Sequence, residues 1–102
     1  MEKTMMLCYN RHTLTEEASR EIGYTGESVF PHYFNPFDRE LANACLKSSL
    51  ANVTKLNLIV TGMSTAFQYV IRYCLANNIE LICLHYNIKT DHYVAIPMST
   101  NS

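Results

Sequence analysis

The chain has 102 residues, of which 48% are hydrophobic and 17% are charged, and its formal net charge is −1. This length and balance are typical of one globular domain with a single core, and they exclude an intrinsically disordered chain. A net charge near zero also argues against a clamp on long DNA or RNA, which needs a basic face, so any nucleic-acid ligand should be small and held in a pocket.

The first part of the chain predicts a strand followed closely by a helix. Residues 4–9 form a short apolar run that is typical of a buried strand. The segment 13–16 (Thr-Leu-Thr-Glu) fits a capping box with Thr13 as N-cap, so a helix should begin there. Gly23 is expected to end this helix. The loop between the two elements is then reduced to residues 10–12.

The middle of the chain predicts two strands and a helix. Ser28–Phe30 fits a short strand, and the aromatic, proline-containing segment Pro31–Phe37 fits a loop or an edge. Apolar residues then recur near helical spacing over Asp38–Asn52, which predicts a second helix. The clearest strand of the chain is Leu56–Thr61.

The last part of the chain predicts a helix and a terminal hairpin. Apolar residues follow the i, i+3, i+4 rule from Ala66 to Leu75, and Asn77-Asn78 is the expected stop of this third helix. Glu80–Tyr86 is the fourth predicted strand. A turn-like segment, Asn87–Asp91, joins it to a fifth strand at His92–Pro97.

The predicted order β-α-β-α-β-α-β-β indicates an α/β fold. We expect a compact Rossmann-like three-layer domain over residues 1–97, with a mainly parallel sheet, right-handed crossovers and a polar tail at residues 98–102. The last strand should run antiparallel at one edge, as part of a C-terminal hairpin. Neither the G-x-G-x-x-G fingerprint of dinucleotide binding nor a P-loop is present in the sequence.

The cysteines indicate a reducing compartment. They are widely spaced and lie within apolar patterns, which predicts buried free thiols; they are Cys8, Cys45, Cys74 and Cys83. The start of the chain has no run long enough for a signal peptide, and no segment approaches the roughly 20 apolar residues of a membrane span. We therefore expect a cytoplasmic protein that makes no contact with a membrane.

Two polar junctions follow the first and third predicted strands. The first holds Asn10, Arg11, His12 and Thr13, and the second holds Thr61, Gly62, Ser64 and Thr65. If the strand order is 2-1-3-4, these strands are neighbours and their helices leave toward opposite faces, which creates a ligand-binding switch point. Two helix N-termini would then point N–H groups into one cleft, an arrangement that suits phosphate.

The residues of this cleft have distinct expected roles. His12 is the candidate acid or base because imidazole titrates near neutrality, although it could also be a cap or an exposed loop residue. Arg11 is the candidate bidentate phosphate contact, with a plain surface charge as the alternative. Gly62 would let a ligand approach the backbone. Ser64 and Thr65 are most simply N-caps of the third helix, with phosphate binding as a compatible second role.

His85 and Tyr86 end the fourth predicted strand at the same carboxyl side of the sheet. Their side chains should point to opposite faces, so at most one of them contacts a ligand directly. A histidine within a strand is more often a packing residue.

Other chemistries fit the sequence less well. The histidines and cysteines show no zinc-ligand spacing, and paired carboxylates are missing from the predicted strand ends. The thiols lie in apolar stripes, where a reactive thiolate is disfavoured. We therefore expect a site that uses no metal and no cofactor.

Three short motifs carry a resemblance to a known family. They are Arg11-His12-Thr13 after the first strand, Thr61-Gly62-x-Ser64 after the third, and the strand Ile-Glu-Leu-Ile-Cys-Leu-His-Tyr at 79–86. In this layout the chain, from Leu7 to Tyr86, resembles the small CRISPR-associated ring nucleases, which are minimal relatives of the CARF sensor domain. The aromatic segment Pro31–Phe37 departs from that pattern.

The resemblance implies a homodimer that binds a cyclic oligoadenylate second messenger across its two-fold axis and cleaves it without a metal. On that reading His12 protonates the leaving 5′-oxygen or activates the 2′-OH, and Arg11 holds the phosphate together with the third helix.

Two other functions stay open on the sequence. One is a non-catalytic sensor or sponge for the same cyclic nucleotide, since binding needs Arg11 and the helix dipoles while only catalysis needs His12. The other is a structural or adaptor protein whose apolar edge serves only dimerisation.

Overall fold

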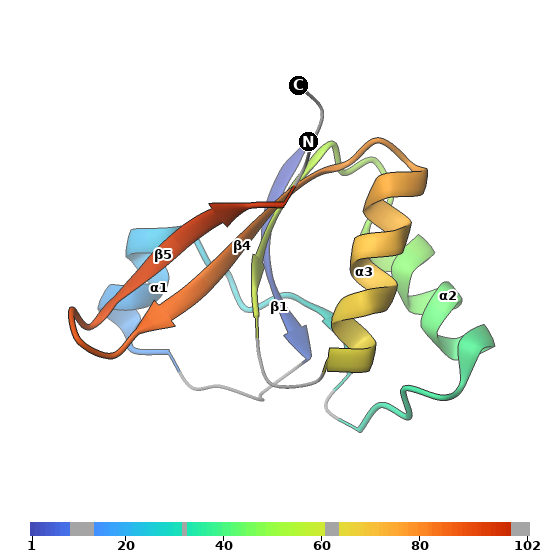
Figure 1. Cartoon of the computed structure of the whole chain (residues 1–102), viewed down its shortest axis with the longest axis horizontal. Coiled ribbons are helices and arrows are strands. Elements are labelled where there is room, and N and C mark those ends of the chain that lie inside the picture. The colour runs from blue at the N-terminus through green and yellow to red at the C-terminus, as the bar shows by residue number, and fades with distance from the viewer. Residues whose placement is uncertain (9–13, 32, 61–63, 99–102) are drawn as a thin grey trace.

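Strands and helices alternate up to a final pair of strands in the computed structural model, which describes residues 1–8, 14–31, 33–60 and 64–98 (Figure 1). Within these residues the elements are β1 (Glu2–Cys8), α1 (Glu16–Ile22), β2 (Ser28–Phe30), α2 (Arg39–Ser49), β3 (Lys55–Ile59), α3 (Ser64–Ala76), β4 (Glu80–Asn87) and β5 (His92–Pro97). The predicted order of elements is confirmed.

One five-stranded sheet, in the order β2-β1-β3-β4-β5, holds the described strands together. β1 pairs in parallel with both β2 and β3, and β3 pairs in parallel with β4. β5 pairs antiparallel with β4, with Tyr86 opposite Tyr93. The α/β fold, the mainly parallel sheet and the antiparallel hairpin at its edge are therefore as the sequence predicts.

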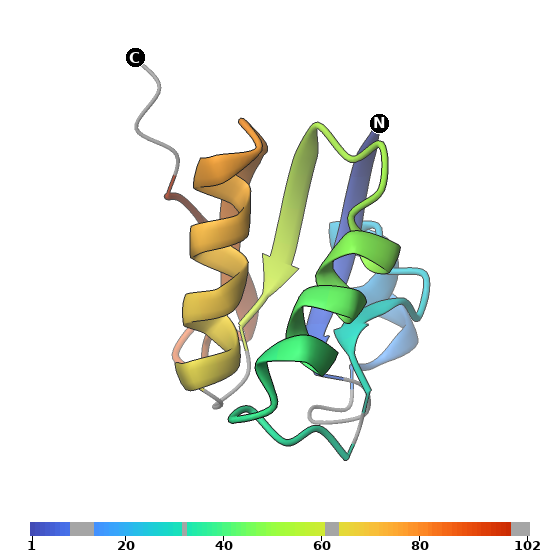
Figure 2. The ribbon, with the colours of Figure 1, turned by 90° about the vertical axis from the view of Figure 1, so that its right-hand side faces the viewer.

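The helices form two unequal layers on the sheet. α2 and α3 lie side by side on one face, and α1 lies on the other (Figures 1 and 2). The larger core fills the space between the sheet and α2 and α3, and its buried residues include Phe30, Leu46, Leu56, Leu58, Val70 and Cys83. On the α1 face, the buried cluster consists of Met6, Ile59 and Leu84, with Leu14, Ile22 and Tyr24 packed against it.

Helix α1 begins two residues later than the sequence analysis predicts. Its N-cap is Thr15, whose Oγ1 accepts a hydrogen bond from the backbone N–H of Ala18, so the prediction of Thr13 as N-cap is wrong. This start places Glu16 and Glu17 in the first turn, where the helix dipole favours carboxylates. The segment between β1 and α1 is consequently longer than the three residues expected.

The end of α1 is as predicted. Gly23 adopts the left-handed conformation, with φ of 75°, and its N–H donates to the carbonyl of Arg20. The next N–H, that of Tyr24, donates to the carbonyl of Ser19, which completes a Schellman motif.

Candidate functional site

The carboxyl ends of β1 and β3 meet at one edge of the sheet. The two strands are parallel neighbours, and Met6 lies opposite Ile59 near their ends. The helix after β1 lies on one face and the helix after β3 on the other (Figure 1). The strand order and helix placement of a switch point, which the sequence analysis could only assume, are thus present in the fold.

Most of the predicted ligand contacts belong to the two segments at this edge. Asn10, Arg11, His12, Thr13, Thr61 and Gly62 lie outside the described residues. The elements that flank these segments are described: β1 ends at Cys8, α1 begins at Glu16, β3 ends at Ile59 and α3 begins at Ser64.

Ser64 and Thr65 occupy the first turn of α3. The prediction that they are N-caps is wrong, because the helix already begins at Ser64. The first turn contains no acidic residue, so no carboxylate of the helix offsets the partial positive charge of its free N–H groups. Ser64 is exposed, whereas Thr65 is half-buried and lies on the flank of α3 that faces α2.

His85 and Tyr86 lie on opposite faces of the sheet, as predicted. His85 alternates with Leu81 and Cys83, which are buried in the larger core, so it lies on the α3 side. Val60 donates its backbone N–H to the carbonyl of Leu84, so His85 follows directly at the level where β3 ends. The fold therefore brings His85 to the same end and the same face as the start of α3.

Tyr86 is held within the terminal hairpin. Its hydroxyl donates to the carboxylate of Asp91, and its ring meets that of Tyr93 edge-on, with 5.5 Å between the ring centroids. The hydrogen bond to the Asp91 carboxylate raises the pKa of the Tyr86 phenol. Tyr86 thus lies on the α1 face, away from the start of α3.

A second set of polar residues, which no sequence motif marks, lies between α2 and α3. A groove of about 330 Å³ lies there, lined by Arg39, Asn43, Leu46, Tyr69, Arg72, Tyr73 and Ala76. An adjoining hollow of about 140 Å³ is lined by Arg39, Thr65, Gln68, Tyr69 and Arg72. The sequence signal for this surface is a second stripe on α3, formed by Thr, Tyr, Arg, Tyr and Ala at positions 65, 69, 72, 73 and 76. This stripe runs along the helix beside the apolar stripe that predicts the helix.

The described thiols fit a structural role. Cys8, Cys74 and Cys83 are buried as predicted, whereas Cys45 is only partly buried. Burial raises the pKa of Cys74 and of Cys83 from 9.0 to about 11, and the neighbouring Cys83 adds to the effect on Cys74. Both groups are therefore protonated near neutral pH and are poor nucleophiles.

The described residues hold neither a metal-ligand cluster nor a helix suited to crossing a membrane. No three His, Cys, Asp or Glu side chains come together there as a metal-ligand group. None of the helices described has the length and apolar character needed to cross a membrane.

Comparisons with known proteins leave the function to be argued from the chain itself. No protein family matches it, and neither the curated proteins nor the solved structures gave a match.

Proposed function

We propose that the carboxyl edge between β1 and β3 binds a phosphodiester of a cyclic oligoadenylate and that the chain cleaves this ring without a metal. The observation that supports the proposal most is the position of β1 and β3 as parallel neighbours whose helices leave toward opposite faces. Ligands of open α/β sheets bind outside the carboxyl ends of the strands at such a reversal. The cytoplasm, where cyclic nucleotide messengers and free thiols both occur, is the compartment we assign to it.

The start of α3 supplies the anion-binding part of this site. Its first-turn N–H groups and the Ser64 and Thr65 hydroxyls can donate to phosphate oxygens, and no acidic residue of the first turn competes for them. Arg11, from the segment after β1, adds a guanidinium that can contact the phosphate in a bidentate manner.

His12 supplies the proton transfer. Attack of a ribose 2′-OH on the adjacent phosphorus breaks the bond to the 5′-oxygen, which takes up a proton as it leaves. An imidazole can deliver this proton or accept the one from the 2′-OH, and such general acid-base help is typically worth about 10²–10⁴-fold in rate. Fixed donors around the phosphate stabilise the charge that develops on its oxygens.

An apolar surface on the α3 side of the sheet supports a homodimer. Leu75, Val94 and Ile96 are 61%, 43% and 45% exposed. Val94 and Ile96 lie opposite His85 and Cys83, which puts them on the face that α3 covers, and Leu75 lies on the flank of α3 away from α2. A two-fold axis parallel to the strands at this surface would bring both carboxyl edges to one end, where a two-fold symmetric ring could contact both copies.

Incubation of the purified chain with labelled cyclic tri-, tetra- and hexa-adenylate in EDTA tests the proposal. We expect one of the rings to be converted to linear products, and His12→Ala to slow this conversion by about 10²-fold or more while binding changes little. His92→Ala is the matched control, since His92 pairs with Glu21 on α1 and has no role in the proposed chemistry.

The other outcomes are equally clear. Tight binding with the ring recovered intact would show a sensor or sponge in place of a nuclease. If none of the rings is bound or cleaved, the proposed function is wrong. If Ile96→Lys leaves the oligomeric state unchanged in light scattering, the dimer surface has been assigned wrongly.

A further inference from the structure

The groove between α2 and α3 is one continuous surface. The larger groove and the adjoining hollow share Arg39, Tyr69 and Arg72, so they form a single channel along the contact of the two helices. On α3 the channel extends from Thr65 to Ala76, which corresponds to about 16 Å at 1.5 Å per residue. Figure 2 shows α2 and α3 facing the viewer side by side along this line. The larger groove, at about 330 Å³, falls at the lower end of the volume range for small-molecule sites.

The charge that lines the groove is positive. Arg39 comes from α2 and Arg72 from α3, and the described residues that line the groove include no carboxylate. The sequence of α3 contains no acidic residue at all. Within the described residues, neither arginine side chain forms an ion pair or a hydrogen bond, whereas the side chains of Lys3 and Lys55 form ion pairs with glutamates. Two unpaired cations on opposite walls of one groove favour the binding of an anion.

The position of Arg39 points the same way. It is the first residue of α2, where the helix dipole disfavours a cation; its neighbours Asp38, the N-cap, and Glu40 are the carboxylates that the dipole favours there. A residue that breaks such a local preference is expected at a functional site more often than elsewhere. An anion between Arg39 and Arg72 would offset the unfavourable position of the Arg39 charge.

The remaining lining residues fit a planar ring with polar edges. Tyr69 and Tyr73 are half-buried on the flank of α3 that faces α2, so each ring presents one part to the groove and packs its other part on the core. Aromatic side chains of this kind stack on nucleobases. The exposed amides of Asn43 and Gln68 offer paired donors and acceptors to a base edge.

We propose that the α2–α3 groove binds a nucleotide. The phosphate lies between the guanidinium groups of Arg39 and Arg72, and the base lies against Tyr69 and Tyr73. This site is on the outer surface of the helical layer and is separate from the proposed catalytic edge, which it meets only at Thr65.

Titration with three related compounds tests this proposal. The probes are 5′-AMP, adenosine, which lacks the phosphate, and ribose 5-phosphate, which lacks the base. In backbone amide NMR spectra of the full chain, 5′-AMP should shift resonances of α2 and α3 around Asn43, Tyr69 and Arg72. The two truncated probes should each bind at least tenfold more weakly, because each loses one half of the contacts.

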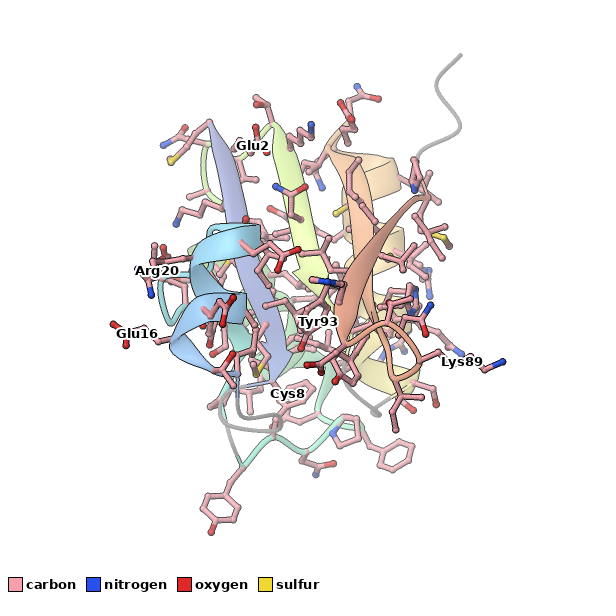
Figure 3. All side chains as sticks on the ribbon, turned by 90° about the vertical axis from the view of Figure 1, so that its left-hand side faces the viewer. Glu2, Cys8, Glu16, Arg20, Lys89 and Tyr93 are labelled. Atoms are coloured by element: carbon pink, nitrogen blue, oxygen red, sulfur yellow. The ribbon has the colours of Figure 1, made fainter. Side chains whose placement is uncertain are left out.

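Matched substitutions separate the two halves of the site. Arg39→Gln and Arg72→Gln should each weaken 5′-AMP binding by about tenfold, because each removes a charge-assisted hydrogen-bond donor. Arg20→Gln makes the same change on α1, which lies on the opposite face of the sheet from the groove. Its side chain points away from the sheet, so the substitution should leave binding unchanged (Figure 3). Tyr69→Leu should weaken 5′-AMP but leave ribose 5-phosphate unaffected, since it removes a stacking ring and keeps an apolar side chain.

Several results would overturn the proposal. One is the absence of any shift in α2 and α3 at millimolar 5′-AMP; another is equal loss of binding in Arg20→Gln and Arg72→Gln. The His12→Ala variant keeps this test independent of the proposed nuclease, because it should bind 5′-AMP in the groove as the unmodified chain does. If only the resonances near Ser64 shift, the nucleotide binds at the carboxyl edge and the groove has no such role.

Discussion

The two faces of the sheet differ in how they are covered. On the face of α2 and α3, five buried helical residues, Ala42, Leu46, Ala66, Val70 and Cys74, pack onto the strands. On the other face, the seven residues of α1 include none that is buried. The strand β3 shows the contrast within one segment, because Leu56 and Leu58 are fully buried toward the two helices, while on the thinner side Ile59 is buried but Lys55 and Asn57 are only partly buried.

Polar contacts take the place of a core over part of the thinner side. Asn57 donates from Nδ2 to Glu2 at 2.7 Å, and Thr4 donates from Oγ1 to the carbonyl of Ile22 at the end of α1. Lys55 lies 4.0 Å from the carboxylates of both Glu2 and Glu80. Figure 3 shows this face, on which α1 lies over the β1 side. Exposed pairs of this kind contribute little stability, so the free energy of unfolding should reside mainly in the other half.

The largest expected effect on the free energy of unfolding comes from truncating one buried leucine in each of the two cores. Leu56→Ala, in the larger core, should lower the free energy of unfolding by about 3–5 kcal/mol, because the close-packed helices cannot collapse onto the cavity. Leu84→Ala, on the α1 face, should cost about 2–3 kcal/mol, since the thin α1 layer can relax. Urea denaturation measures both values, and equal losses would contradict the asymmetry.

The second largest effect should come from raising the pH, which should lower the stability of the larger core. Because the pKa of Cys74 and of Cys83 is about 11 in the folded chain and about 9 when unfolded, the unfolded state loses its thiol protons first. The free energy of unfolding should therefore fall between pH 8 and pH 10, by roughly 1 kcal/mol for each thiol. A variant with Cys74→Ala and Cys83→Ala should be less stable at pH 8 but should show a flatter dependence in urea titrations. A slope identical to that of the parent chain would refute the assignment.

The smallest expected effect comes from removing the N-cap side chain of α2 or of α1. Asp38 accepts from the N–H of Leu41 at the start of α2, and Asp38→Ala should lower global stability by about 1 kcal/mol. Thr15→Ala removes the equivalent bond from α1, which buries no residue and can open by itself. Faster hydrogen exchange in α1 with little change in the urea midpoint is the expected result. A shift of the midpoint as large as that of Asp38→Ala would show that α1 unfolds only with the rest.

The sequence predicts the fold well because its periodic segments are long and clear. The apolar stripe of α3, the apolar run at Leu56 and the turn before His92 each predict one element. The alternation of strands and helices then predicts a mainly parallel sheet. The sequence misplaces the start of α1 because two threonines, Thr13 and Thr15, both precede an acidic pair, and the capping box fits the first. The choice depends on how the chain leaves β1, which local sequence does not encode.

The site was harder to predict than the fold. Polar junctions after β1 and β3 are visible as motifs, and the parallel pairing of the two strands puts their carboxyl ends at one edge of the sheet. Arg39 and Arg72 carry no motif, and they belong together only because α2 and α3 lie side by side. These two arginines are 33 positions apart in the sequence, so only the tertiary structure shows that they line one surface.

The unequal borders of the sheet limit how the chain can self-associate through its backbone. β2 has three residues and offers few free backbone groups, whereas the six residues of β5 form a longer open border. Strand addition therefore has one effective docking side per chain. Two chains that paired there would occupy both long borders, so we expect such growth to stop at a closed pair and not to continue into a fibre.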